Sequence, residues 1–253
     1  MPAVRRAAAR RGFVAAALLV VGIALPACSL GRQAKVAAAP TTSVPATTST
    51  TAAPAITLGA VARVPSVAVY SGPGNLAPVR FMQNPTVEHI PLVFLARARQ
   101  GEWLYVQLPM RPNQSMGWIR EADVDVSEVH SRILVEAAAH KLTVFQDNNP
   151  VFSATVATGT GGTPTPLGSF YIDAIVKLNR PDTVWGPYQL SVTGFSDVLQ
   201  HFGGGQGQIA IHGTNAPGLI GGNVSHGCVR MLNPDITQVA SLVTVATPVD
   251  IRA

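Results

Sequence analysis

The stretch IAIHGTNAPGLIGGNVSHGCVRM, residues 209–231, places His212, His226 and Cys228 in a segment made mostly of Gly, Asn, Ser, Thr and apolar residues. Its first part, IAIHGT, alternates in the way that predicts a strand, which would project His212 at a fixed point. A His/His/Cys group of this kind can bind a metal ion, form a nucleophile with its base, or consist of ordinary loop residues. The sequence around it favours the second of these.

A thiol beside an imidazole is suited to acyl transfer. A thiol attacks an acyl group as the thiolate, but a free Cys has a pKa of about 8.5 and needs a base at neutral pH. We expect His212 to be that base for Cys228, with the Gly213 carbonyl bonding its other ring nitrogen. Gly227 permits close approach of the backbone, so the amides around Gly227 and Cys228 are candidate donors to an oxyanion.

The spacing His-x13-His-x-Cys could instead supply three zinc ligands. No CxxC pair or nearby second cysteine supports a metal site, and the loop glycines suit an acyl group better. We therefore expect neither a metal nor another cofactor.

A second segment completes a resemblance to a known family. IHGT followed by SHGCVRM, with 15 residues between His212 and Cys228, and TGTGGTPTPLGSF at residues 158–170 resemble the L,D-transpeptidase catalytic domain of the YkuD family. The likeness covers about residues 130–253. It implies a β-rich domain in which a cysteine attacks the carbonyl between an L-configured and a D-configured centre of a peptidoglycan stem.

The resemblance assigns roles to single positions. It implies that Cys228 is the nucleophile and His212 the general base. His226 would shape the pocket and steady the oxyanion, while Arg230 would either hold a substrate carboxylate or brace the loop. Tyr188, in the segment WGPY, is a candidate to line the cleft.

The implied reaction has two steps. The cysteine attacks the bond between meso-diaminopimelate and D-Ala in a tetrapeptide donor, D-Ala leaves, and a thioester forms. A diaminopimelate amine of a second stem then attacks the thioester and makes a 3-3 cross-link. With water as acceptor the enzyme would be an L,D-carboxypeptidase, and a non-catalytic wall-binding lipoprotein is the alternative from another class.

The N-terminus is typical of an export signal. A cationic start precedes FVAAALLVVGIAL, residues 13–25, which is shorter than the roughly 20 residues a membrane-spanning helix needs. LPACS resembles the lipobox of bacterial lipoproteins, in which Cys28 would be acylated; cleavage without lipidation is the alternative. We therefore expect residues 1–28 to be a signal peptide. The mature protein would then lie at the cell envelope, lipid-anchored to the outer face of the plasma membrane if Cys28 is acylated.

The cysteine count supports a reactive Cys228. The chain has two cysteines, and if Cys28 is acylated or removed, Cys228 is an unpaired thiol in an oxidising compartment. An unpaired thiol there is a liability unless it is used, although a small buried side chain is the simpler alternative.

Charge gives no indication of a nucleic-acid partner. The formal net charge is +5, but four of the 18 Lys and Arg residues lie within the first eleven positions. Without them, 14 basic side chains stand against 13 acidic ones. We therefore expect no nucleic-acid partner. The resemblance implies peptidoglycan stem peptides as partners, and we expect a monomer.

Composition divides the rest of the chain into three parts. Residues 29–56, rich in Ala, Thr, Ser and Pro, predict a disordered linker. Residues 57–126 contain short alternating strands, and GEWLYVQL followed by GWIREADV resembles bacterial SH3-like domains, so a small β-barrel is expected. In residues 130–253, DNNP predicts a hairpin turn and Asn233 the N-cap of a helix. The expected fold is mainly β, with one or two short helices.

Overall fold

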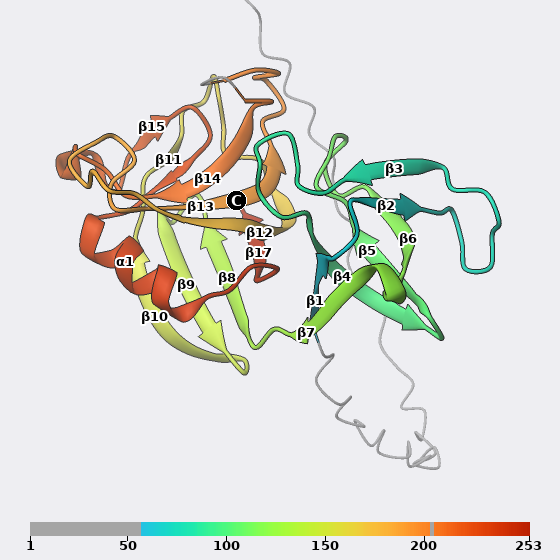
Figure 1. Cartoon of the computed structure of the whole chain (residues 1–253). Coiled ribbons are helices and arrows are strands. Elements are labelled where there is room, and N and C mark those ends of the chain that lie inside the picture. The colour runs from blue at the N-terminus through green and yellow to red at the C-terminus, as the bar shows by residue number, and fades with distance from the viewer. Residues whose placement is uncertain (1–56, 203–204) are drawn as a thin grey trace, which may run out of the picture. The chain divides into compact units, whose positions relative to one another are not determined.

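The computed structural model describes residues 57–202 and 205–253, which belong to one compact unit (Figure 1). The predicted signal peptide, Cys28 and the predicted linker lie outside these residues. Seventeen strands and one α-helix, α1 (Asn233–Leu242), make up the described part together with two short 3-10 turns, which confirms a mainly β fold. No helix in this part is long and apolar enough to cross a membrane.

The N-terminal part is an antiparallel sheet of order β6-β5-β4-β1-β7, with a separate pair β2-β3. Alternation in β5 buries Leu104 and Val106 completely, and these pack with Phe94 and Ile119. The sheet confirms the predicted strands, while the SH3 likeness stays a prediction. The strands are β1 (Leu58–Ala62), β2 (Ser66–Val69), β3 (Arg80–Gln83), β4 (Val93–Gln100), β5 (Trp103–Gln107), β6 (Met116–Arg120) and β7 (Val124–Glu128).

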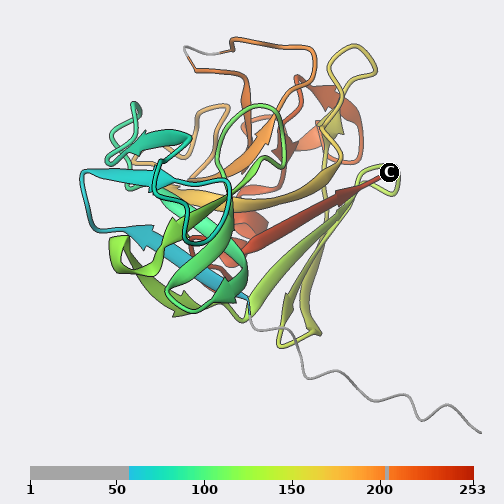
Figure 2. The same ribbon diagram turned by 90° about the vertical axis from the view of Figure 1, so that its right-hand side faces the viewer.

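The C-terminal part is an eight-stranded sheet of order β10-β9-β8-β17-β12-β13-β14-β16. The last strand of the chain, β17, lies between β8 and β12, as Figure 2 shows in red. Only the pairs β17-β8 and β14-β16 are parallel in this sheet. The strands are β8 (Ser131–Glu136), β9 (Lys141–Gln146), β10 (Asn149–Thr155), β12 (Gly168–Lys177), β13 (Tyr188–Phe195), β14 (Gln208–His212), β16 (Val229–Arg230) and β17 (Pro248–Arg252).

The predicted hairpin is present, and the predicted helix cap is wrong. Asp147 and Asn148 both have positive φ, 47° and 66°, as a tight two-residue turn between β9 and β10 requires. Helix α1 starts at Asn233, but Leu232 occupies the cap position and no side chain caps the helix. The Asn233 amide is used elsewhere, because its Oδ1 accepts a hydrogen bond from the Thr214 amide at 2.8 Å.

The two β-rich parts share a buried core. The Tyr171 hydroxyl, on β12, donates to the Val93 carbonyl of β4 at 2.8 Å, and Gln107 Nε2 donates to the Ser169 carbonyl at 2.8 Å. Tyr171 is fully buried and packs with Leu95. These contacts fix the N-terminal sheet against the sheet that carries His212.

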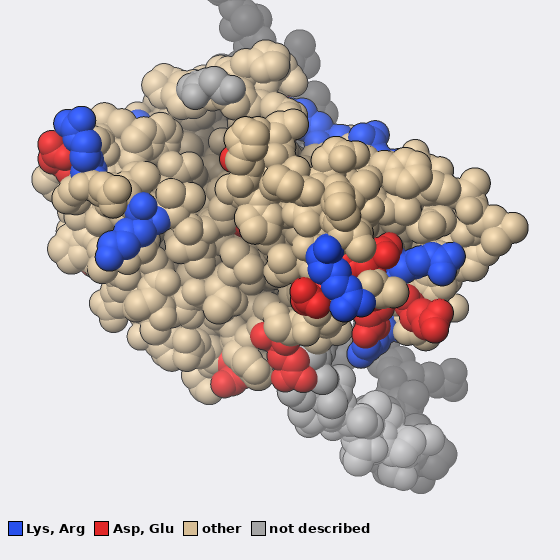
Figure 3. Space-filling view, viewed as in Figure 1, with Lys and Arg blue, Asp and Glu red and all other residues tan. Residues whose placement is uncertain are grey.

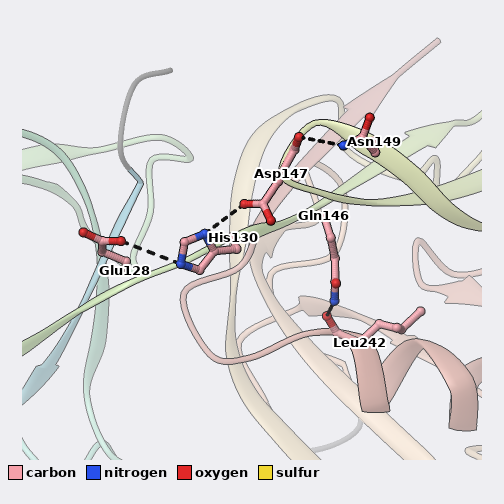
Figure 4. Close-up of polar contacts among 6 residues, drawn as sticks. All are labelled: Glu128, His130, Gln146, Asp147, Asn149 and Leu242. Atoms are coloured by element: carbon pink, nitrogen blue, oxygen red, sulfur yellow. Dashed lines mark hydrogen bonds and ion pairs between the residues drawn. The ribbon is translucent and has the colours of Figure 1, made fainter. Parts of the chain in front are cut away.

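Exposed polar contacts mark the segment that joins the two parts (Figure 4). His130 Nδ1 lies 2.9 Å from Asp147 Oδ1, and its Nε2 lies 3.7 Å from Glu128 Oε2. Such exposed pairs contribute little to stability. Figure 3 shows a larger group of charged side chains over the N-terminal sheet. One exposed ion pair of the N-terminal part joins Arg63 and Asp125 at 3.6 Å.

Candidate active site

The parallel pair β14 and β16 brings the predicted base and nucleophile together. Ile211 pairs with Val229, and His212 pairs with Arg230. Residues paired in register project on the same face of a sheet, and successive residues alternate between faces. His212 and Arg230 therefore share one face, and Cys228, which directly precedes β16, lines a cavity together with Ala210 of β14. Ile211 and Val229 point to the other face, into the main core that α1 covers, and both are fully buried.

His212 is held in one tautomer. Its side chain is 3% exposed, and its Nδ1 donates to the Gly213 carbonyl at 2.7 Å. That bond assigns the proton to Nδ1 and leaves Nε2 as the basic nitrogen. The Trp185 ring covers the imidazole, with centroids 4.7 Å apart. The predicted orienting role of the Gly213 carbonyl is therefore present in the geometry.

Burial keeps the imidazole neutral. The pKa of His212 is lowered to about 4; desolvation is the main cause, and the nearby charge of Arg230 acts in the same direction. The carbonyls of Gly213 and Val184 act in the opposite direction and do not offset burial. At neutral pH the ring can therefore accept a proton.

Burial also keeps the thiol protonated. Cys228 is half-buried and unpaired. Desolvation raises its pKa, while the Ala210 backbone and the charge of Arg230 lower it. The resting site thus holds a thiol and a neutral imidazole, and the thiolate has to form when a proton moves to His212.

The turn before Cys228 is shaped by Ser225. The buried Ser225 hydroxyl donates to the Cys228 carbonyl at 2.5 Å and accepts from the Gly227 amide at 3.1 Å. Gly227 has φ +119°, a conformation that strongly favours glycine. The segment TGTGGTPTPLGSF, residues 158–170, packs against this turn, because the Thr160 amide donates to the Ser225 carbonyl at 3.0 Å. The Gly227 amide, one of the two expected oxyanion donors, is thus already engaged.

His226 and Arg230 lie at the edges of the site. His226 is exposed, and its ring stacks on Phe202 with centroids 5.2 Å apart. Arg230 is half-buried, its backbone pairs with Ala157, and its Nε is buried without a hydrogen-bond partner. Among the residues that the structure describes, Arg230 forms no ion pair, so its charge acts on Cys228 and His212 uncompensated.

Tyr188 is not among the residues that line the cavity beside Cys228, and its expected place at the cleft stays a prediction. Tyr188 alternates with Gln189 along β13, and it is Gln189 that lines the cavity beside Cys228. Tyr188 therefore faces the main core, and only its carbonyl reaches the site, where it accepts from the Gly213 amide at 3.3 Å. The WGPY segment contributes Trp185 to the cavity instead.

A cavity of about 450 Å³ lies beside Cys228. Its floor is the sheet face, with Ala174 of β12, Ser191 of β13 and Ala210 of β14. Glu88 and Ile90, from the N-terminal part, also line it. Sequence reasoning missed this contribution, because nothing in residues 84–92 signals a distant contact.

Asn233 is a further site residue that the sequence assigned to another role. Its Oδ1 accepts from the Thr214 amide at 2.8 Å, and its Nδ2 donates to the Pro181 carbonyl at 3.2 Å. A Cβ on Gly213 would lie 2.4 Å from Asn233 Oδ1. The close packing of Asn233 on Gly213 fixes the carbonyl that orients His212. In residues 57–202 and 205–253, no three His, Cys, Asp or Glu side chains group as a metal ion would need.

Comparisons with known proteins find similarity in the C-terminal part. A family model described as the L,D-transpeptidase catalytic domain, YkuD, matches residues 130–251. The proposed L,D-transpeptidase YkuD of Bacillus subtilis is 39% identical over 120 residues, which are 47% of this chain and 65% of that protein. Its Bacillus licheniformis counterpart is 36% identical over 120 residues, 47% of this chain and 64% of its own length. The chain thus spans slightly less than two thirds of each relative.

Solved structures of transpeptidases also match. A mutant L,D-transpeptidase of Enterococcus faecium is 19% identical with a TM-score of 0.39, over 49% of this chain and 50% of that one. L,D-transpeptidase 3 of Mycobacterium tuberculosis is 14% identical with a TM-score of 0.41, over 60% of this chain and 79% of that one.

Proposed function

We propose that residues 130–251, which match the family model described as the L,D-transpeptidase catalytic domain, YkuD, form such a domain, and that this protein joins peptidoglycan stem peptides by 3-3 cross-links through a thioester on Cys228. The observation that carries the proposal is the register of β14 and β16. It sets His212 opposite Arg230, two residues after Cys228, and Cys228 lines a cavity of about 450 Å³ together with Trp185, whose ring packs on the imidazole.

The first step forms the acyl-enzyme. Nε2 of His212 takes the thiol proton as Cys228 Sγ attacks the carbonyl between diaminopimelate and D-Ala. The Cys228 amide, rather than the engaged Gly227 amide, stabilises the oxyanion, and the positive charge of Arg230 adds to this. The C–N bond breaks, His212 returns the proton to the departing D-Ala amine, and a thioester remains on Cys228.

The second step transfers the acyl group. The diaminopimelate amine of a second stem attacks the thioester, and His212 takes a proton from that amine. The C–S bond breaks, and the proton passes to Cys228, which restores the resting thiol. Water in place of the amine gives L,D-carboxypeptidase activity through the same residues.

The proposal includes a place in the cell. Export through residues 1–28 and acylation of Cys28 would hold the enzyme at the outer face of the plasma membrane, where its substrate is assembled. The segment LPACS supports this. Incubating expressing cells with a labelled fatty acid should label the wild-type chain and not the Cys28→Ala variant. Equal labelling of both would show that Cys28 is not the acylated residue.

Product analysis tests the activity. The full chain is incubated with a disaccharide-tetrapeptide, and the products are identified by mass spectrometry. We expect a cross-linked dimer that has lost one D-Ala, formed by the wild type and not by Cys228→Ala. Trimmed tripeptide without dimer would favour the carboxypeptidase alternative, and unchanged substrate would favour a wall-binding protein.

A further inference from the structure

A second cavity, of about 260 Å³, adjoins the one beside Cys228. The two cavities share Glu88, Ile90, Gln206 and Gln208 in their walls, so they lie next to each other. The second cavity lies between residues of the N-terminal part and the face of the catalytic sheet. Its charged lining residues are Arg80, Glu88 and Asp173.

Asp173 faces this cavity beside a β-bulge. Along β12, Ile172 pairs with Val192 and Ala174 pairs with Ser191, so Asp173 is an extra residue with no partner on β13. Ile172 packs in the main core, so alternation turns Asp173 to the opposite face, and the bulge keeps Ala174 on that face as well, where it lines the cavity beside Cys228. Asp173 therefore joins the lining of the cavity instead of entering the apolar core.

The Asp173 carboxylate is only half satisfied. It is 8% exposed, and Gln208 Nε2 donates to its Oδ2 at 2.7 Å. Its Oδ1 is buried and has no hydrogen-bond partner. Neither Asp173 nor Glu88 takes part in an ion pair among the described residues. A buried carboxylate oxygen without a partner destabilises the folded state unless a hydrogen-bond donor or a cation contacts it.

Electrostatics point to a cation at Asp173. Burial is the main cause that raises the pKa of Asp173, and the charge of Glu88 raises it further, against the opposing Gln208 and Ser191 side chains. Two acidic groups that disfavour each other's charge are both stabilised by a cation placed between them. Arg80 adds a positive group on the N-terminal side of the same cavity.

The position suits one part of a stem peptide. Gln208 lies on β14, so its bond to Asp173 draws the carboxylate over β13, about 10 Å or two strand spacings from β16. An extended diaminopimelate side chain places its D-centre about 7 Å beyond the reacting carbonyl. The Cys228 side chain covers the remaining distance. That D-centre is an amino-acid end group with an ammonium and a carboxylate.

We propose that this second cavity binds the zwitterionic end group of the donor diaminopimelate, its ammonium at Asp173 and Glu88 and its carboxylate at Arg80. This rests on the proposed function, because it presumes that the L-centre of the same residue is attacked by Cys228. The subsite selects the donor before chemistry begins, and the N-terminal part contributes two of its three charges.

Donor analogues test the subsite. Thioester formation by the full chain is followed with tetrapeptides that carry diaminopimelate, lysine or norleucine at the third position. Lysine keeps the ammonium, and norleucine has neither charge. We expect wild-type acylation, as kcat/KM, to fall by about tenfold or more for each charge removed. Asp173→Asn should lose the preference for lysine over norleucine, and Arg80→Gln the preference for diaminopimelate over lysine.

Controls separate a subsite from a structural role. Glu102→Gln removes an exposed acidic group outside both cavities and should keep all preferences. Alkylation of Cys228 by the neutral reagent iodoacetamide should be the same in every variant. Equal wild-type rates for all donors, or a loss in Asp173→Asn that is equal for all donors and iodoacetamide, would overturn the subsite.

Two further outcomes are decisive. If the charges matter only when the analogue is the acceptor attacking a preformed thioester, the donor assignment is wrong. If the wild type forms no thioester with any donor although iodoacetamide labels Cys228, the proposed function fails, and the subsite with it.

Discussion

At the scale of single residues, burial sets the chemistry of Cys228 and His212. In water an imidazole and a thiol would titrate within about two units of each other. In this site desolvation moves the two pKa values further apart, because it lowers the pKa of His212 and raises that of Cys228. A preformed thiolate–imidazolium pair is therefore disfavoured at rest. In the proposed mechanism the proton moves only when a substrate carbonyl is in place, which would protect the unpaired thiol from unwanted reactions.

The pH dependence of acylation should report this arrangement. His212 must be neutral to act as base, and its pKa is about 4. We expect the acylation rate of Cys228 to be nearly constant from neutral pH down to about pH 5 and to fall with a midpoint of about 4. Stopped-flow or quenched mass spectrometry measures it.

Folding must be followed in the same samples. The unfolded chain binds the His212 proton at about pH 6.5 and the folded chain only at about 4. Stability therefore falls as the pH drops through this window. The variant His130→Gln, altered at an exposed histidine outside the site, should keep the midpoint. A wild-type midpoint near 6.5 would contradict a buried, neutral base.

Sequence reasoning predicted a contact correctly where the two groups are adjacent in the chain. The Gly213 carbonyl follows His212 directly, so its bond to the ring could be foreseen. The role of Tyr188 could not, because it depends on which face of β13 each residue takes. Asp173 had a weak signal, as an acidic residue inside the apolar run GSFYIDAIVKL.

At the scale of elements, the site depends on contacts between loops and strand ends. Asn233, at the start of α1, bonds the Thr214 amide and packs on Gly213. A helix terminus thereby fixes the carbonyl that orients His212. The sequence predicted the helix but not this use of Asn233, because a cap is a local pattern and the bond to Thr214 spans 19 positions.

Substituting Asn233 tests that link. Asn233→Leu leaves the Thr214 amide without its acceptor, which should cost about 1–3 kcal/mol of unfolding free energy. It should also slow acylation of Cys228, because the Gly213 carbonyl is no longer fixed. Asn233→Asp keeps the acceptor oxygen and should lose less of both. Urea unfolding and the acylation rate measure these effects; a Leu variant as fast and as stable as the wild type would exclude the positioning role.

At the scale of the whole molecule, the N-terminal part completes the wall of the cavity beside Cys228. The core shared through Tyr171 holds its sheet against β12, and Glu88 and Ile90 line the cavity beside Cys228. The sequence predicted two domains in succession, and their strands are present. It could not predict their joint cavity, since that depends on packing between residues far apart in the chain.

The shared core predicts cooperative unfolding. Tyr171→Phe keeps the ring but removes the hydroxyl that donates to the Val93 carbonyl at 2.8 Å. We expect a loss of about 1–2 kcal/mol, because a buried carbonyl loses its partner. Tyr105→Phe, whose hydroxyl bonds to no group among the described residues, is the matched control. Calorimetry should show one transition for the wild type; two well-separated transitions would show that the parts fold independently.

The covalent state of Cys228 tests the central claim most directly. The full chain is mixed with a disaccharide-tetrapeptide, quenched in acid, and analysed by intact mass and peptide mapping. We predict an adduct of the donor minus D-Ala on Cys228, absent in Cys228→Ala and formed slowly in His212→Ala. A folded wild-type protein whose Cys228 reacts with iodoacetamide but never carries this adduct would contradict the account.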